Sequence, residues 1–473
     1  MGAAGAGGGA GNFAIAITDN SVALRGTYAF GIAIDSEGNY FVVGKVYTST
    51  RYGYLIKIDP EGTILSSARI DASAISYEPY SICIDSSDNI YIGGRANGSL
   101  PYIIKYNSSL SLQWAYEYSG NGTVAIAESS YPAVKTDGTD VFMVYAATLS
   151  GVGTRGVMLR VACSDGDVEA ARRLYKSGGT QQYYLSDIEI SGSYIYIGGF
   201  DITNSESFVL GLNKSNNTSK SDTNIVAMDN ASRSGDGRQI NLNKDASGIV
   251  YAASKSFTAN GRNNAGVAKF EGDAAFEQGD YHVYGTQQFA NSTFGSVAIP
   301  TNNADNDVII WSGFGHTDGS KLPTFMSVDN ALDGTVNWMN YYKFAGTYSD
   351  GVSNSWAIDV EPSGASAIKA VMSKDGKAVV AIGVMNFDQD SSNTSKYHMA
   401  VFSQTIDGNH SAPQNDSLTI VTDGQINTLT DDITNTSLNF ANDDNTSSTS
   451  KTDKSNSFSI NTSYSMYSDS VTF

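Results

Sequence analysis

The chain has 473 residues and a net charge of −19. It has no basic cluster that could follow a phosphate backbone, which argues against direct nucleic-acid binding. It also has no apolar run of about eighteen residues, which argues against a membrane-spanning helix. The 48 Gly, 28 Tyr and 19 Phe favour short strands joined by tight turns.

The chain opens with residues 1–11, which read MGAAGAGGGAG. This segment has no basic start and no Leu or Val, so we do not expect it to be a secretory signal peptide. Because glycine carries no side chain, it permits close approach to another backbone. We therefore expect a docking arm whose contact residues are Gly2, Gly5, Gly7, Gly8, Gly9 and Gly11.

A repeated phrase follows at intervals of about fifty to seventy residues. It consists of an apolar strand, an Asp/Ser/Gly/Asn turn and a second apolar strand that ends in small residues. The clearest copies are 31–44 (GIAIDSEGNYFVVG) and 81–94 (SICIDSSDNIYIGG). Fainter copies lie at 133–146, 188–199, 240–253, 297–313 and 368–383. A constant period of this length indicates a repeat fold.

Each repeat continues into a third and a fourth strand, as in 54–64 (YLIKIDPEGTI) and 102–114 (YIIKYNSSLSLQW). Four antiparallel strands in each of seven repeats predict an all-β fold, a seven-bladed β-propeller. Residues 12–24 alternate like a strand but have no repeat of their own. Because open sheet edges invite aggregation, we expect this segment to close the last blade beside 397–402.

The last segment, 411–473, is polar: 40 of its 63 residues are Ser, Thr, Asn or Asp. This composition is typical of disorder. However, 418–421 and 458–466 alternate apolar and polar residues as half-buried strands do. Two alternatives stay open, a disordered tail and an arm that becomes ordered on a neighbouring subunit. The predicted organisation is thus an N-terminal arm (1–11), a propeller (12–410) and a C-terminal arm (411–473).

Residue types that often carry chemistry form no convincing site in the sequence. The turns 35–39 and 85–89 contain Asp and Asn, but they lack the closing Glu of a calcium loop, and Asp and Asn also build hairpin turns. The four His lie in different repeats without zinc-ligand spacing. Cys83 and Cys163 lie on or beside apolar strands and are interpreted as buried hydrophobes. We predict no catalytic residue, no metal and no cofactor.

Carboxylates and tryptophans leave weaker possibilities. Glu117 or Asp187 could form a glycosidase couple with Glu189 only if both carboxylates face one pocket, which the sequence cannot establish. Trp114 and Trp338 hold equivalent repeat positions, which favours a role in blade packing. Trp356 lies in the less regular stretch 350–358 and is the candidate for stacking on a sugar ring.

The repeated phrase resembles the SBBP-type β-propeller repeats of secreted bacterial proteins and of tail or fibre proteins from marine tailed phages. The residues that carry this resemblance are Ile34-Asp35-Ser36, Asn39-Tyr40, Ile84-Asp85-Ser86, Asn89-Ile90-Tyr91, Lys105-Tyr106-Asn107 and Trp114. The resemblance is strong over residues 27–118, and the Gly-rich opening followed by Asn12-Phe13 is similar to the start of cyanophage structural proteins.

The resemblance implies a propeller and a non-enzymatic role in a virion, as a tail, fibre or spike component. With this role we expect other virion proteins as partners, a homo-oligomer or several copies in each particle, and contact with a host-surface glycan. The alternative is a free extracellular propeller that binds or cleaves carbohydrate through its central funnel.

Overall fold

The computed structural model describes a large part of the chain as β-strands and turns. The described residues are 13–18, 27–46, 52–72, 76–120, 125–127, 130–149, 153–176, 183–201, 206–214, 225–228, 240–259, 262–270, 278–284, 289–299, 307–316, 321–329, 332, 336–341, 345–347, 353–358, 369–386, 396–407, 440–444, 449–453, 458–461 and 467–470. Within these ranges, all elements of regular secondary structure are β-strands. No helix in the described residues is long and apolar enough to cross a membrane. The fold is all-β, as predicted.

The first two sheets follow the clearest copies of the repeat, and their strands pair in chain order. The first sheet contains β2 (Thr27–Ile34), β3 (Tyr40–Val46), β4 (Tyr52–Ile58) and β5 (Ile64–Ala72). The second contains β6 (Tyr77–Ile84), β7 (Ile90–Ala96), β8 (Leu100–Tyr106) and β9 (Leu112–Gly120).

The next two sheets repeat this order with small variations. In the third sheet, two short strands both pair with β12: β10 (Ala125–Ile126), β11 (Ala133–Thr136), β12 (Asp140–Leu149), β13 (Gly153–Ala162) and β14 (Val168–Lys176). The fourth contains β15 (Tyr183–Ser191), β16 (Tyr194–Asp201), β17 (Glu206–Asn213) and β18 (Ile225–Met228).

An eight-stranded sheet follows, made of two groups joined through the one parallel register pair Asn263–Asn291. Its first group is β19 (Ile240–Lys244), β20 (Val250–Ala259), β21 (Arg262–Phe270) and β22 (Gln278–Tyr284). Its second group is β23 (Phe289–Ala298), β24 (Asp307–His316), β25 (Lys321–Asp329) and β26 (Val336–Tyr341).

The last sheet combines the two ends of the repeat region. It contains β27 (Ala345–Thr347), β28 (Ser353–Ile358), β29 (Ala370–Met372), β30 (Lys377–Asn386), β31 (Lys396–Thr405) and β1 (Ala14–Thr18). β1 pairs antiparallel with β31, and Ala14 lies opposite Phe402. The N-terminal strand therefore lies beside the segment 397–402, where the sequence places it.

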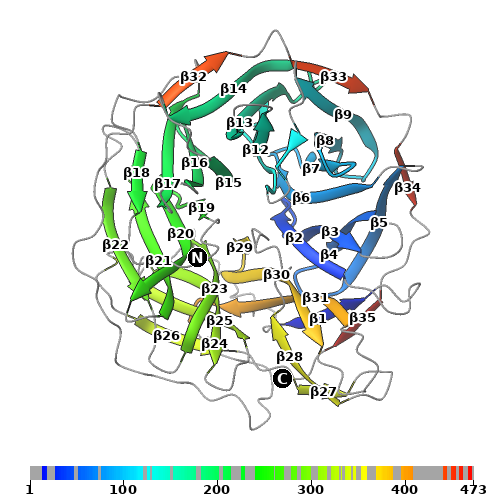
Figure 1. Ribbon diagram of the computed structural model, residues 1–473. Coiled ribbons are helices and arrows are strands. Elements are labelled where there is room, and N and C mark those ends of the chain that lie inside the picture. The colour runs from blue at the N-terminus through cyan, green and yellow to red at the C-terminus, as the bar shows by residue number, and fades with distance from the viewer. Residues whose placement is uncertain are drawn as a thin grey trace, which may run out of the picture.

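The sheets are arranged around a common centre, with β2, β6, β15, β19 and β29 toward the inside (Figure 1). Each of the seven copies of the repeated phrase falls on two consecutive antiparallel strands, from β2–β3 to β29–β30. The strand–turn–strand reading of the phrase is confirmed within the described residues.

The small residues that end the phrase have a steric cause. The Tyr54 hydroxyl donates to the main-chain carbonyl of Tyr28 at 2.6 Å, directly over Gly44. A Cβ on Gly44 would lie 1.8 Å from that carbonyl oxygen, and a Cβ on Gly94 would lie 2.2 Å from the Glu78 carbonyl oxygen. Only glycine fits between the first and third strands at these two positions.

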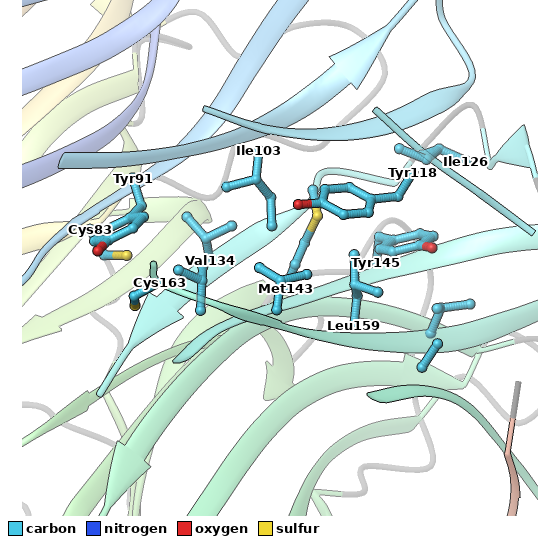
Figure 2. Close-up of a cluster of buried hydrophobic side chains, with 14 of the residues drawn as sticks. Cys83, Tyr91, Ile103, Tyr118, Ile126, Val134, Met143, Tyr145, Leu159 and Cys163 are labelled. Atoms are coloured by element: carbon cyan, nitrogen blue, oxygen red, sulfur yellow. The ribbon is translucent and has the colours of Figure 1, made fainter. Parts of the chain in front are cut away.

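The hydrophobic cores lie between neighbouring sheets. Figure 2 shows the core between the second and third sheets, which includes Cys83, Tyr91, Ile103, Tyr118, Val134, Met143, Tyr145 and Leu159. Similar cores join the last sheet to the first, the first to the second, the third to the fourth and the fourth to β19–β21. Because full burial of one such side chain is worth roughly 1.5–3 kcal/mol, sheet-to-sheet contact is a main source of stability.

The C-terminal segment adds an outer strand to four sheets. These strands, which we call the C-terminal strap, are β32 (Phe440–Asp444) on β14, β33 (Thr449–Asp453) on β9, β34 (Phe458–Asn461) on β5 and β35 (Tyr467–Ser470) on β1. In Figure 1, β32, β33 and β34 lie along the outer rim.

The strap pairs with sheets of its own chain, which differs from both alternatives predicted from the sequence. The predicted strand at 458–466 is present over Phe458–Asn461, whereas 418–421 lies outside the described residues. The strap is ordered here because the edges of β14, β9, β5 and β1 supply the backbone partners that a polar segment cannot supply for itself.

Candidate functional site

The binding residues predicted from sequence lie largely outside what the structure describes. Trp356 lies on β28 opposite Asn386 of β30, but its side chain is outside the described part. The glycine arm, 1–11, is also outside the described residues. Both predictions therefore stay predictions.

The Asp-containing turns are closed by their own backbone. Asp35 Oδ1 accepts the N–H groups of Glu37 at 2.9 Å and of Asn39 at 2.8 Å. Asp85 makes the same bonds to Ser87 at 2.8 Å and Asn89 at 2.9 Å. These oxygens already have turn partners, and no group of three His, Cys, Asp or Glu in the described ranges is placed to hold a metal ion. The turn interpretation is confirmed.

Cys83 and Cys163 are free and buried, as predicted. Both belong to the core of Figure 2. Burial raises the pKa of the Cys83 thiol to about 12. A thiol in this state is a poor nucleophile at neutral pH, so it serves packing.

Five charged side chains on or next to inner strands form what we call the axial ion cluster: Lys135 (β11), Asp187 and Glu189 (β15), Lys244 (β19) and Lys369 (just before β29). Lys135 Nζ lies 2.7 Å from Glu189 Oε2, and Lys244 Nζ lies 3.9 Å from Glu189 Oε1. Lys369 Nζ lies 2.5 Å from Asp187 Oδ1. These pairs connect inner strands of four sheets.

Asp187 is the most deeply placed member of the cluster. Its carboxylate accepts the backbone N–H groups of Ile188 at 2.8 Å and Leu242 at 2.7 Å. Burial raises the pKa of Asp187 above its ordinary value, although Lys369 and the two N–H groups act in the opposite direction. The carboxylate therefore depends on these partners to remain charged inside the fold.

Lys135 and Lys244 have pKa shifts in opposite directions. Burial alone would lower the pKa of Lys135, but Glu189 outweighs it and the pKa is raised. Burial lowers the pKa of Lys244, and the nearby charge of Lys135 acts in the same direction. Asp187 and Glu189 are thus each paired with at least one lysine, and these ion pairs join strands of neighbouring sheets.

A second buried network, the Glu78 cluster, consists of Lys45, Glu78, Tyr80 and Arg95 with the ring of Phe30. Arg95 Nη2 lies 3.0 Å and Lys45 Nζ 3.5 Å from Glu78 Oε2. Tyr80 donates its hydroxyl to the same oxygen, and Arg95 Nη2 donates to the Tyr80 hydroxyl oxygen at 3.0 Å. Lys45 Nζ also lies 5.1 Å from the Phe30 ring centroid.

The charges of the Glu78 cluster stabilise one another away from water. Burial by itself would raise the pKa of Glu78, but Lys45, Tyr80 and Arg95 together lower it to about 2. Burial raises the pKa of the Tyr80 hydroxyl, so it remains a hydrogen-bond donor. Tyr131, which lies between β10 and β11 of the third sheet, packs edge-on against Tyr80 with ring centroids 4.6 Å apart. The cluster therefore also contacts the third sheet.

The Glu78 cluster was not among the sites predicted from the sequence. A signal was nevertheless present, because each charge interrupts an otherwise apolar strand: Lys45 in YFVVGKV, Glu78 in YEPYSICI and Arg95 in IYIGGRA. A charge inside such a strand must find a partner. Three of them in adjacent strands indicate a common network.

Comparison with known proteins bears on the fold. The family model described as SBBP, beta-propeller repeat, matches residues 65–101, from β5 into β8. The chain carries a β-propeller repeat. With the antiparallel sheets arranged around one centre, it is a β-propeller repeat protein. No curated protein matches the sequence.

Several solved structures are similar at low identity. The intramolecular trans-sialidase from Ruminococcus gnavus is 11% identical with a TM-score of 0.42, over 83% of this chain and 96% of that one. The phage phi92 endosialidase is 11% identical with a TM-score of 0.41, over 89% and 75%. The WD40 domain of SCAP from fission yeast is 11% identical with a TM-score of 0.35, over 82% and 98%. At such low scores, we draw no conclusion on activity from them.

Proposed function

We propose that this chain is a non-enzymatic structural protein of a phage particle, as a tail, fibre or spike component. In this proposal, the sheets form one seven-bladed β-propeller whose ring is completed by β1. The C-terminal strap is the observation that carries it, because the end of the chain is used as an added outer strand on successive sheets. Backbone pairing of this kind protects sheet edges and stiffens the body. A structural component of a particle needs this rigidity, because its role depends on keeping its shape.

The inner carboxylates support the non-enzymatic reading. Asp187, Glu189 and Glu78 are 0%, 1% and 1% exposed, and each is bound by a Lys or Arg. A catalytic acid or base has to reach its substrate within hydrogen-bond distance. These three side chains are engaged in holding sheets together.

The proposal extends to the location and the binding partners of the protein. Its location is the virion, its partners are other virion proteins and further copies of itself, and its outer loops contact a host-surface glycan. Residues 1–11 dock against a neighbouring protein through their glycines. Repeat sequences of the SBBP type, which this chain matches over 65–101, resemble those of phage tail and fibre proteins.

Particle composition tests this role. Particles are purified on a density gradient and their proteins quantified by mass spectrometry against the major capsid protein. We expect this chain in the particle fraction at a fixed ratio that survives a high-salt wash. Particles that lack it would overturn the proposal. Flanking genes for portal, tail-tube or capsid proteins would support it.

The alternative function is a free extracellular propeller that binds or cleaves carbohydrate. One observation favours it, namely that the Glu78 cluster brings a carboxylate, a tyrosine and two cations together. Glu78 and Tyr80 are, however, only 1% and 2% exposed. The full-length chain on a glycan array and in a hydrolysis screen decides this alternative. Binding or turnover that disappears in Y80F, a variant without the hydroxyl, would favour it over the virion role.

A further inference from the structure

The edge of the third sheet and the first strand of the C-terminal strap are complementary in charge. β32 pairs with β14 in a register that sets Asp444 opposite Arg172 and Asp443 opposite Arg173. Consecutive residues of a strand lie on opposite faces, so this register puts one acid–base pair on each face of the sheet. Opposite charges directly across an antiparallel pair stabilise that pairing and oppose others. The two pairs therefore define where the strap begins.

The strap binds to sheets that are already complete. β14, β9 and β5 are the outermost strands of their sheets apart from the strap, and each pairs with the strap along four or five residue pairs. Without the strap, each edge would present a row of free N–H and C=O groups. Such an edge accepts any strand with the right register, whichever chain supplies it.

An identical copy of the chain supplies the same strand. The stretch between Thr405, the end of β31, and Phe440, the start of β32, contains more than 30 residues. An extended chain covers roughly 3.3–3.6 Å per residue, so this length is enough for β32 to reach the third sheet of a neighbouring molecule. Exchange of an identical element between copies keeps every native pair and costs little free energy.

We propose that the C-terminal strap is exchangeable, and that two copies of this chain join by placing the strap of each on the sheets of the other, beginning with β32 on β14. The Arg172–Asp444 and Arg173–Asp443 pairs set the register of that first strand. Within one molecule, the strap blocks these edges. At high local concentration, the same strands connect neighbours. The inference concerns any two copies and does not depend on the virion role, so the two proposals fail independently.

A charge-swap experiment tests the exchange. The edge variant carries R172D and R173D, and the strap variant carries D443R and D444R. In each variant alone, β14 and β32 of the same chain therefore carry like charges at facing positions. The reversed strap matches the reversed edge only across molecules. After equal amounts are mixed and warmed to just below the unfolding midpoint, native mass spectrometry should show at least tenfold more dimer than in either variant alone. The matched control, all four substitutions in one chain, should remain as monomeric as the unchanged protein.

A second measurement avoids charge reversal, in case a reversed variant does not fold. Tyr175 lies opposite Ala441 in the same register. Chains carrying Y175C and chains carrying A441C are mixed under mild oxidation, and a disulfide-linked dimer is expected after warming. The double variant should instead form the bond within one chain. The proposal is overturned if both mixtures stay monomeric while the two single-chain controls behave as described.

Discussion

Trp114 and Trp338 make the same bond in two sheets that are far apart in the sequence. Trp114 Nε1 donates to the carbonyl oxygen of Cys163 at 3.2 Å, and Trp338 Nε1 donates to that of Ile406 at 2.8 Å. Cys163 and Ile406 each come directly after a strand, β13 and β31. The equivalence predicted from the sequence is therefore a shared contact, in which the fourth strand of one sheet is fastened to the next sheet.

Loss of the indole donor should weaken that contact. In W338F, the Ile406 carbonyl loses its Trp338 hydrogen bond, and we expect the free energy of unfolding to fall by about 1–2 kcal/mol. Urea denaturation followed by circular dichroism measures this. L65A, a change at a side chain that is 52% exposed, is the control and should shift stability far less. An unchanged midpoint for W338F would show that the bond does not hold the sheets together.

The second prediction concerns a side chain that is added, not removed, at the crowded position Gly44. G44A would place a Cβ 1.8 Å from the Tyr28 carbonyl oxygen and 2.2 Å from the Tyr54 hydroxyl oxygen. Because main-chain atoms must move, we expect a loss of about 1–3 kcal/mol or more and a lower thermal midpoint. Gly138 meets nothing nearby and has a φ of +90°, which Asn tolerates better than most residues. G138N should therefore be the milder change.

The Glu78 cluster predicts a specific pH dependence. The folded-state pKa of Glu78, about 2, lies below the ordinary value of 4.5. Its contribution is therefore fully present above about pH 4.5 and is lost as the pH falls toward 2. E78Q leaves Lys45 and Arg95 buried without their carboxylate, so a loss of about 3–5 kcal/mol at pH 7 is expected.

The test for Glu78 is the free energy of unfolding measured at several pH values between 5 and 2, the range over which its contribution is lost. The free energy of unfolding should decline less steeply with acid in E78Q than in the unchanged protein. E169Q, a change at an exposed carboxylate, should keep the original slope. Parallel acid profiles for E78Q and the unchanged protein would contradict the prediction.

Lys369 and Asp187 should be energetically coupled. K369M leaves a fully buried carboxylate without its cation, and D187N leaves the lysine without its anion, so each should cost about 3–5 kcal/mol. The double variant should cost clearly less than the two single costs together, because neither charge is then stranded. A double-mutant cycle in urea measures the coupling, and purely additive costs would mean that the pair is not formed.

Local signals made much of this fold predictable. Period-two apolar strands and Asp/Asn turns depend on neighbouring residues only, so the strands around Asp35 and Asp85 could be placed from sequence. The partners of Lys369 and of β32 could not, because they depend on which distant strands share a centre or an edge. The strap was harder still, since a polar strand on a rim needs only backbone partners, and its sequence carries little of the apolar pattern that indicates a core strand.

The pairing of β1 with β35 decides how the molecule responds to mechanical load. Ile15, near the start of the described chain, lies opposite Ser470, near its end. A pull applied between Ile15 and Ser470 therefore acts at one end of this ladder and opens it one bond pair at a time, because the load is not shared by all the bonds at once. β1 also remains bound along its other side to β31, so β35 separates first and relieves tension while the rest of the sheet stays intact.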